Sequence, residues 1–428
     1  MAKEPSYLKK KIIFKKFVIT KLLATSEFAW VYEGKNVNKN IPVAIKIEKK
    51  DKYNLLESEA YILMGIKGFG IPQIISFGKC GPFKILIEEL LGKDLLNIWK
   101  SVPFKKDPWG HNNTFIKDIC LLAIQGIERL KYIHEKNVIH RDIKPKNFLI
   151  GRNNPNDIYL IDFGFSKKYR SSRTGKHIKF SKTNMLYGSI NFSSLNSIKG
   201  YEYSRRDDLE SFGYMLIYLA KGGWTPWMNY SKRNSDGENA LDKIITKVRM
   251  ELTDEILCKG LPNEFVHYMK YVKNLGFEQE PNYEYLNSLF VSILSKKEIS
   301  QNLTFFWIKQ KPKKNEKILK INTGKNYLNN LTPNKNSKND LRSNCVKRLY
   351  SKIKESLINN SSKKIFSSTN YYKRNNNTND TINKSENNIN LHIQIFNTNA
   401  NTNNINVNST QRNSAYNNKI REKNKFPK

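Results

Sequence analysis

The stretch from residue 137 to residue 164 constrains the fold of this chain more than any other part of its sequence. It reads NVIHRDIKPKNFLIGRNNPNDIYLIDFG and carries Asp142, Asn147 and Asp162 beside two short apolar runs. Apolar runs of three or four residues between turn residues are typical of short strands. We therefore expect a strand pair that buries its apolar side chains and leaves the three polar residues on turns.

The three polar residues have the spacing that phosphoryl transfer requires. In that reaction one carboxylate orients a hydroxyl nucleophile, while a second carboxylate and an amide oxygen hold magnesium on a polyphosphate. Asp142 would be the first carboxylate, and Asp162 with Asn147 would bind Mg2+. Either tripeptide alone, H-R-D or D-F-G, could be a chance match on a loop. Chance is a poor explanation for both together, in the order H-R-D-x-K-x-x-N then D-F-G with a strand pair between them.

Composition divides the 428-residue chain near residue 310. Apolar residues recur in strand and helix patterns before that point, whereas Asn supplies 31 of the last 118 residues. A segment this poor in apolar runs cannot bury enough surface to offset its ordering entropy. We therefore expect residues 311–428 to form an Asn/Lys-rich disordered tail.

The net charge of +36 favours acidic partners. The four cysteines are far apart and include no C-x-x-C pair, so neither a disulfide framework nor a zinc site is indicated, and a reducing compartment is the simpler interpretation. No apolar run is long enough for a signal peptide or a membrane span. We expect a cytoplasmic or nuclear protein with no membrane partner.

The first part of the chain predicts a small sheet and one helix. Residues 17–34 are expected to form two strands joined by a tight turn, and residues 41–48 a third strand that contains V-A-I-K. Lys46 is either an exposed strand lysine or the cation that contacts the ATP phosphates and pairs with a glutamate of the next helix. We expect Glu57 to be that glutamate, and Glu59, two positions along, to face solvent.

Further along, a strand followed by a connector and a helix is predicted from KILIEELLGKDLLNIW, and a long amphipathic helix leads to His140. The segment SRRDDLESFGYMLIYLAKGG predicts a buried helix. Asp208 at its start is placed to accept hydrogen bonds from backbone donors of the catalytic turn. The rest of the folded part reads as helical scaffold.

No Asp or Glu occurs between Phe165 and Lys199, although the segment is rich in cations. Its eight basic residues are Lys167, Lys168, Arg170, Arg173, Lys176, Lys179, Lys182 and Lys199. Such a run is commonly a solvated face. Next to a catalytic aspartate it would also raise the local concentration of an acidic or phosphorylated substrate.

Taken together, these residues resemble a protein kinase, and specifically the casein kinase 1 family. The kinase-wide motifs are V-A-I-K at 43–46, H-R-D-I-K-P-K-N at 140–147 and D-F-G at 162–164. The family-specific ones are KKYR at 167–170, R-T-x-x-H-I at 173–178, SRRDDLESFGY at 204–214, P-W at 226–227 and LCKGLPNEF at 257–265. Where most kinases have A-P-E, this family has S-I-N, and residues 194–196 are S-L-N.

The resemblance covers residues 17–310 and implies an α+β, two-lobed protein kinase fold. The implied domains are a small, mainly β N-lobe at 17–91 and a larger, mainly α C-lobe at 92–310, preceded by a basic N-terminal extension at 1–16 and followed by the tail. The implied activity is transfer of the ATP γ-phosphate to serine or threonine of acidic or phosphorylated proteins, by a monomer that uses ATP and Mg2+.

Roles for individual residues follow from the same resemblance. Asp142 would be the catalytic base, Lys144 would stabilise the transferring phosphoryl group, and Asn147 with Asp162 would bind Mg2+. The nucleotide phosphates would be held by Lys46 paired with Glu57, and the adenine by backbone groups of Glu89 and Leu91. The residues expected to sandwich the adenine are Leu23, Val31, Ala44, Leu149 and Ile161.

The chain departs from the family pattern in three ways. The glycines of its G-x-G-x-x-G loop are replaced by Ala24, Ser26 and Ala29, and any of these that needs a positive φ would be strained by about 1 kcal/mol, so we expect weakened ATP binding. Glu88 occupies a position that is usually apolar at the back of the nucleotide pocket. Its carboxylate would either rise in pKa through burial or compete for Lys46, and we expect contact with Lys46. Asn191 replaces an arginine that reads a substrate phosphate, which favours acidic over phosphorylated substrates.

Two alternatives come from other classes of function. A pseudokinase scaffold with weak ATP binding is favoured by the altered loop and by Glu88, and disfavoured by the presence of every polar residue that catalysis needs. A protein that binds nucleic acid or other acidic surfaces through its basic tail is disfavoured, because the tail lacks the interleaved aromatic residues that stack on bases. The tail's Asn and Lys content could equally reflect codon bias of an AT-rich genome.

Overall fold

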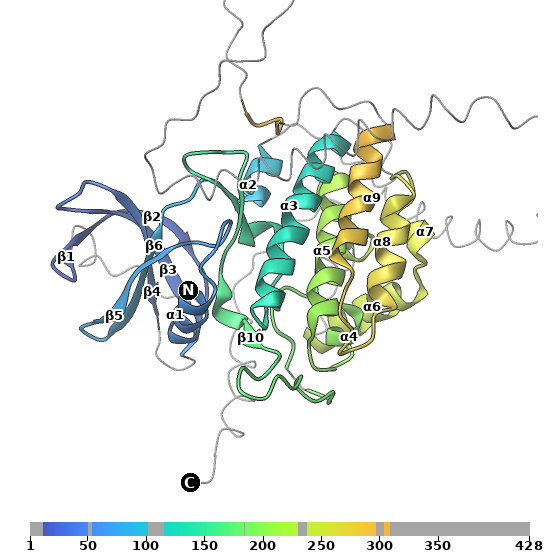
Figure 1. Ribbon diagram of the computed structural model, residues 1–428, viewed down its shortest axis with the longest axis horizontal. Coiled ribbons are helices and arrows are strands. Elements are labelled where there is room, and N and C mark those ends of the chain that lie inside the picture. Colours follow the sequence, from blue (N-terminus) through green and yellow to red (C-terminus); the bar gives the residue numbers. More distant parts are fainter. Residues whose placement is uncertain are drawn as a thin grey trace, which may run out of the picture. The chain divides into compact units, whose positions relative to one another are not determined.

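The computed structural model describes residues 12–49, 54–101, 115–183, 185–229, 238–296 and 304–308. Within these residues a six-stranded antiparallel sheet is followed by a set of helices (Figure 1). The predicted class, a β-sheet N-lobe followed by a helical C-lobe, is confirmed. The predicted tail at 311–428 lies outside the described residues.

The sheet has the strand order β1-β2-β3-β4-β6-β5. Its strands are β1 (Ile12–Ile13), β2 (Phe17–Thr25), β3 (Ala29–Asn36), β4 (Pro42–Glu48), β5 (Ile74–Cys80) and β6 (Phe83–Glu89). The shorter strands are β7 (Val138–Ile139), β8 (Phe148–Ile150), β9 (Ile158–Leu160) and β10 (Lys167–Lys168). The helices are α1 (Leu55–Gly65), α2 (Leu95–Lys100), α3 (Ile116–Glu135), α4 (Leu195–Ile198), α5 (Arg205–Ala220), α6 (Glu238–Glu251), α7 (Asp254–Leu257), α8 (Glu264–Lys273) and α9 (Tyr283–Lys296).

Alternation along the strands gives the sheet two different faces. One face buries an apolar cluster made of Ile13, Phe17, Ile19, Trp30, Tyr32, Val43, Ile45, Ile47, Ile85 and Ile87. The other face carries half-buried residues, among them Val31, which lies opposite Lys46 in the β3–β4 pair, and Ala44. The sequence pattern therefore assigns Lys46 to the face that is not filled by the apolar cluster.

The sheet begins earlier than the sequence indicates. Residues 12 and 13 were expected to belong to a basic N-terminal extension, but they pair with β2 in the register Ile12 to Val18 and Ile13 to Phe17. Ile13 is buried in the apolar cluster. The chain reverses between the two strands through positive φ angles at Phe14 and Lys15. Residues other than glycine rarely adopt this conformation, so the sequence does not indicate a turn here.

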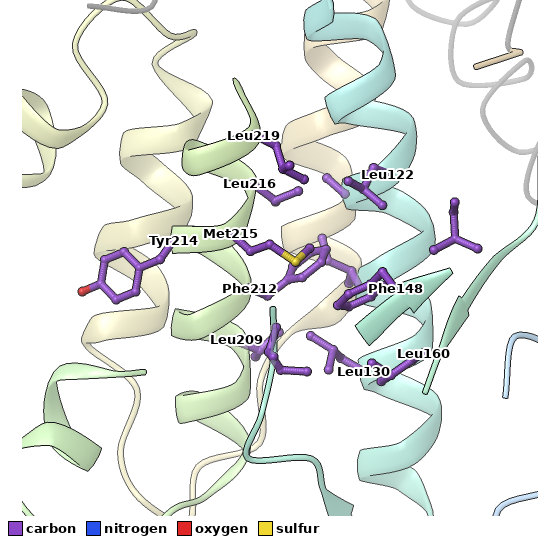
Figure 2. Close-up of a cluster of buried hydrophobic side chains, with 14 of the residues drawn as sticks. Leu122, Leu130, Phe148, Leu160, Leu209, Phe212, Tyr214, Met215, Leu216 and Leu219 are labelled. Carbon is purple, nitrogen blue, oxygen red and sulfur yellow. The ribbon is translucent and has the colours of Figure 1, made fainter. Parts of the chain in front are cut away.

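The helical lobe is organised around α3 and α5, whose buried residues occur on nearly all sides. Figure 2 shows Phe212 of α5 pointing toward Phe148 of β8; the two ring centroids are 5.6 Å apart. α3 carries Gly126 at this level, and a Cβ there would lie 2.2 Å from the Phe212 ring. Glycine is therefore needed for the close approach of α3 and α5, and this packing fixes the position of β8.

The predicted strand pair between the two motifs is present. β8 and β9 pair in the register Phe148 to Leu160, Leu149 to Tyr159 and Ile150 to Ile158. Phe148 and Leu160 are fully buried, so the hairpin is held by the helical core while its ends carry the catalytic turns.

The last described segment, residues 304–308, is a short aromatic stretch that packs on the helical lobe. Phe305 is buried, and the backbone N–H of Phe306 donates to Asp118 Oδ1 at 2.9 Å. Trp307 donates its indole N–H to the carbonyl of Pro155 at 3.0 Å. The helical lobe thus extends at least to this segment. No helix among the described residues is long and apolar enough to cross a membrane.

Candidate active site

The catalytic turn places two polar side chains against the carboxylate of Asp142, which is almost fully buried. Its Oδ2 atom accepts hydrogen bonds from Lys144 Nζ at 2.5 Å and from Asn147 Nδ2 at 3.1 Å. Asn147 Nδ2 also donates to the Asp142 carbonyl at 2.8 Å. The second carboxylate oxygen, Oδ1, is buried and has no partner among the described residues. A buried acceptor without a partner is unusual, and the expected role of Asp142 as base would give this atom a hydroxyl donor.

Asp208 at the start of α5 holds the backbone of this turn in place. It accepts hydrogen bonds from the backbone N–H groups of His140 at 2.7 Å and Arg141 at 2.8 Å, and it contacts His134 Nε2 at 3.0 Å. Burial alone would raise the pKa of Asp208, but the hydrogen bond and charge of His134 outweigh it and hold that pKa below its usual range. The prediction that Asp208 accepts backbone donors from the catalytic turn is confirmed.

Two residues of the site have backbone conformations that non-glycine residues rarely adopt. Arg141 has a φ of 67° and Asp162 a φ of 68°, and such conformations cost roughly 1–3 kcal/mol each. Contacts with neighbouring residues hold both backbone conformations in place. Arg141 stacks on the ring of Tyr187 at 4.1 Å, and the ring of His140 contacts the carbonyl of Ile161, the residue before Asp162, at 3.0 Å.

Lys46 connects the sheet to helix α1 and to the D-F-G turn. Its Nζ atom lies 2.6 Å from Glu59 Oε2 of α1 and 2.6 Å from Asp162 Oδ1. Glu59 also accepts the backbone N–H of Phe163 at 3.1 Å. Burial would lower the pKa of Lys46, but the two carboxylates outweigh it and raise the pKa well above its usual value. The lysine is therefore held as a cation at the point where the sheet, α1 and the D-F-G turn meet.

The prediction that Glu57 pairs with Lys46 is wrong. Glu57 has a side chain that is 58% exposed and pairs with Lys84 at 2.9 Å. Glu59, expected to face solvent, is buried because it lies three positions after Leu56 and four before Leu63, on the buried stripe of α1. The helix starts at Leu55 after Asn54, whose left-handed conformation fixes this phase.

Residues 17–312 match the family model described as the protein kinase domain. The chain belongs to the protein kinase family. The match covers the sheet and the helical lobe together, and it includes Lys46, Asp142 and Asp162. This match does not distinguish the casein kinase 1 family from other protein kinases.

Protein kinases use ATP and Mg2+, and the residues of this kinase fit that pair. Asn147 gives its Nδ2 protons to Asp142, so its side-chain oxygen remains for a cation. Asp162 is a carboxylate whose pKa is lowered by Lys46 although burial acts in the opposite direction. Oxygen atoms of carboxylate and amide groups are the ligands that Mg2+ prefers, so Asn147 and Asp162 would hold the ion, which neutralises charge on the phosphates.

The residues expected to sandwich adenine lie on the unfilled face of the sheet and on the β8–β9 hairpin. Leu23 of β2 is 44% exposed, and the other four are half-buried: Val31, Ala44, Leu149 and Ile161. Incomplete burial of five apolar side chains from separate strands suits an apolar ligand surface. Their contact with adenine stays a prediction.

The two predicted connector residues differ in their backbone partners. The N–H of Glu89 donates to the carbonyl of Gln73 at 2.9 Å, and the N–H of Gln73 donates to Glu89 Oε1 at 2.8 Å. This pairing removes the N–H of Glu89 from the expected adenine contact. Leu91 is buried, and its backbone N–H and C=O have no hydrogen bond to another described residue.

The expected contact between Glu88 and Lys46 is not present. Glu88 lies on β6 opposite Ala44 of β4, and no ion pair of 4.0 Å or less joins its carboxylate to Lys46. Its Oε1 atom is buried without a hydrogen-bond partner among the described residues. The alternative outcome holds instead, because burial and the negative charge of Glu59 raise the pKa of Glu88 to about 8.

Replacing Glu88 by glutamine is expected to stabilise the kinase, with a gain that grows as the pH rises. A carboxyl whose pKa is raised on folding to about 8 keeps its proton in the folded state while the unfolded chain ionises near 4.5, so it reduces stability as pH rises between these values. The difference in Tm between Glu88→Gln and the unmodified chain should be small at about pH 5 and largest above about pH 8. Thermal unfolding at both pH values measures it.

The control for this prediction is Glu251→Gln, because Glu251 is 64% exposed on α6. Its Tm is measured at the same two pH values as the reference for removing one exposed carboxylate. A Tm difference for Glu88→Gln that stays constant with pH would show that Glu88 has the same pKa in the folded and unfolded chains.

The loop that lacks glycine is closed by Ser26. Ser26 Oγ accepts the backbone N–H groups of Ala29 at 3.0 Å and Phe28 at 3.3 Å, and the N–H of Ser26 donates to the Ala29 carbonyl at 2.9 Å. Neither Ala24, Ser26 nor Ala29 has a positive φ, so the expected backbone strain is absent. We expect weaker nucleotide binding for another reason, because the Ser26 hydroxyl oxygen occupies the N–H of Ala29, a backbone donor of the kind that binds phosphate.

Replacing Ser26 by alanine is therefore expected to lower the KM for ATP about fivefold, the effect of about one net hydrogen bond. Removing Oγ releases the N–H group of Ala29 without adding backbone freedom. Steady-state kinetics at varied ATP measures the effect, with Thr20→Ala as the control because the exposed Thr20 hydroxyl bonds a carbonyl of β3. An increased KM for Ser26→Ala would show that Ser26 preorganises the loop for phosphate.

Proposed function

We propose that this kinase transfers the γ-phosphate of ATP to serine or threonine hydroxyls of acidic proteins, as its resemblance to the casein kinase 1 family implies. The observation that carries the proposal is the assembled ion network, in which Lys46 pairs with Glu59 and Asp162 at 2.6 Å each. A pseudokinase scaffold would not need this arrangement, because maintaining three charged groups in a cleft is costly unless a ligand uses them.

In the proposed reaction Asp142 accepts the proton of the substrate hydroxyl. Its unpartnered Oδ1 atom is the acceptor for the substrate hydroxyl proton, while Oδ2 stays bonded to Lys144 and Asn147 and so fixes the carboxylate plane. Lys144, at 2.5 Å from the same carboxylate, keeps a positive charge beside the phosphoryl group that moves.

The acidic preference is supported by the cations that follow the D-F-G turn. Six of them are exposed and have no carboxylate within 4.0 Å in the described parts of the chain: Lys168, Arg173, Lys176, Lys179, Lys182 and Lys199. A seventh, Lys167, is neutralised by Glu202 at 2.9 Å. Unpaired cations beside a catalytic carboxylate attract acidic polypeptides, and this attraction weakens as the salt concentration rises. Asn191 adds no charge for a phosphate, so acidic residues are the proposed determinant.

A transfer assay tests the proposal with the full chain, Mg2+, labelled ATP and two peptides that differ only by Glu or Gln around one serine. We expect label on the acidic peptide, with loss of transfer on chelation of Mg2+. The Asp142→Asn chain is the blank for contaminating kinase. Equal label from the chain and its blank would end the catalytic proposal and favour the scaffold.

The charge of the basic segment is tested by the triple change Lys176→Gln, Lys179→Gln and Lys182→Gln. We expect the KM for the acidic peptide to rise about fivefold at low salt, because each exposed charge contributes a few tenths of a kcal/mol. The matched control, Lys35→Gln with Lys79→Gln and Lys100→Gln, removes the same charge from exposed positions on the sheet and on α2. A rise of KM in both would indicate attraction by net charge alone.

A further inference from the structure

Arg249 of α6 is a buried cation that binds only backbone. It is 3% exposed, and its Nη2 atom donates to the carbonyls of Asn191 at 2.6 Å and Ile190 at 3.0 Å. Its Nη1 atom donates to the carbonyl of Ser193. One guanidinium thus binds three carbonyls within four consecutive residues.

Aromatic rings complete the surroundings of this arginine. The guanidinium lies 4.1 Å from the ring centroid of Trp227 and 4.7 Å from that of Tyr214. Trp227 also donates its indole N–H to the Asn191 carbonyl at 3.0 Å. Figure 2 shows Tyr214 pointing to the side of α5 away from Phe212, and Tyr214 and Trp227 belong to the same apolar core as Phe212.

No carboxylate lies within 4.0 Å of Arg249 among the residues that the structure describes. Burial lowers its pKa to about 10, with Tyr214 and Glu210 acting in the opposite direction, so the side chain remains a cation at neutral pH. Burying a cation without a carboxylate is costly, and an apolar side chain of similar size would fill the same space at lower cost. The residue is thus better explained by what it positions than by stability.

The backbone that Arg249 binds runs past the catalytic carboxylate. We name residues 188–194 the substrate segment. At one end, Gly188 has a φ of 79°, and a Cβ there would lie 2.7 Å from Asp142 Oδ1, so this backbone lies against the unpartnered oxygen. At the other end, Ser194 Oγ donates to Asp207 Oδ1 at 2.6 Å. Both ends are fixed, and the middle is held by Arg249.

We propose that Arg249 is a positioning residue. It fixes the position of the substrate segment relative to Asp142, and thereby the position of the substrate hydroxyl. This inference rests on the proposed phosphate transfer to protein. It differs from a stabilising role because the three carbonyls belong to the segment beside the reacting carboxylate. Loss of the Arg249 guanidinium would release the middle of that segment while its two ends stay anchored.

The test compares Arg249→Met and Arg249→Lys with Lys247→Met, a change at a 76% exposed position of the same helix. For Arg249→Met we expect kcat/KM for the acidic peptide to fall at least about tenfold, while the KM for ATP changes less than about twofold. Arg249→Lys keeps the charge and part of the donor set, so its loss should be intermediate. Lys247→Met should resemble the unmodified chain.

Hydrogen exchange of the same chains gives a readout that does not need catalysis. We expect faster exchange of the amides of residues 188–194 in Arg249→Met, with unchanged exchange in α3 and α5. A folded Arg249→Met chain with unchanged exchange in the substrate segment and unchanged peptide kinetics would overturn the proposal. Equal losses for ATP and peptide, with faster exchange throughout the helical lobe, would overturn it too and indicate a structural role.

The two proposals fail in different ways. If the unmodified chain transfers no phosphate to protein, the proposed function is wrong, and the exchange data alone decide whether Arg249 holds the segment. If Arg249→Met is insoluble, Arg249→Lys and Trp227→Phe, which removes one hydrogen bond to Asn191, are compared in the same two measurements. Unchanged exchange in both of these chains would count against the proposal.

Discussion

Asp142→Asn is expected to lower kcat for phosphate transfer to the acidic peptide by about 10²- to 10⁴-fold, the usual contribution of a general base. The amide can occupy the same space and accept a hydrogen bond from Lys144, but it cannot take a proton from the substrate hydroxyl. Because the nucleotide is expected to contact other groups, affinity for ATP should change little. Single-turnover transfer and a separate ATP-binding measurement distinguish these effects.

The control for this prediction is Glu135→Gln, which makes the same chemical change at a side chain that is 58% exposed at the end of α3. Its kcat should match the unmodified chain. A loss in the Asp142→Asn chain that appeared only as weaker ATP binding would contradict the assignment of Asp142 as base. The carboxylate would then act by orienting Lys144 and Asn147.

Much of this site follows from short-range sequence pattern, because motif spacing fixes which residues lie on one turn. Asp142, Asn147 and the β8–β9 hairpin are within a few residues of one another, and the apolar alternation of the hairpin is visible in the sequence. Asp208 is distant in the chain, but its place at the start of a strongly apolar helix indicates a buried N-terminus. The sequence therefore predicts the catalytic turn and the residue that holds it.

Other parts of the site depend on helix phase and on three-dimensional neighbours that pattern does not fix. Both Leu55 and Leu56 are apolar, so the start of α1 decides whether Glu57 or Glu59 joins the buried stripe, and the left-handed Asn54 decides the start. The prediction that Glu88 contacts Lys46 was wrong, because Glu59 and Asp162 already occupy the lysine and this division of its contacts cannot be seen in the sequence.

Arg249 has no signal in the sequence that would have singled it out. It lies in a polar stretch more than fifty residues after the carbonyls it binds, and backbone acceptors leave no trace in residue type. The clue that pattern does offer is the pair Pro226 and Trp227, which marks a rigid aromatic neighbour. A buried arginine without an acidic partner can be found only once the fold brings α6 beside the substrate segment.

The residues of the candidate site fall into two groups, those that match the kinase motifs and those that depart from them. The ion network and the catalytic turn are complete, whereas the phosphate loop is closed by Ser26 and the pocket wall carries the protonated Glu88. We expect both departures to affect nucleotide binding and to leave the base unchanged. Weak ATP affinity with normal chemistry once ATP is bound is the combination that this division implies.

The second large effect concerns the glutamate of α1. Glu59→Gln is expected to reduce kcat/KM for ATP about 100-fold, whereas Glu57→Gln should change it less than about threefold. Glu59 is a buried partner of Lys46, and removing its charge leaves Lys46 paired with Asp162 alone, so the lysine is drawn toward the residue expected to bind Mg2+. Glu57 is exposed and contacts Lys84, away from this network.

Steady-state kinetics on both variants at varied ATP and Mg2+ measures the difference, and thermal unfolding confirms that each chain is folded. Because the two changes remove the same charge two residues apart on one helix, each serves as the control for the other. A larger loss for Glu57→Gln would mean that α1 turns about its axis when nucleotide binds, so that Glu57 replaces Glu59 beside Lys46. Equal, small losses would mean that Asp162 alone positions the lysine, and the ion network would then no longer support an active kinase.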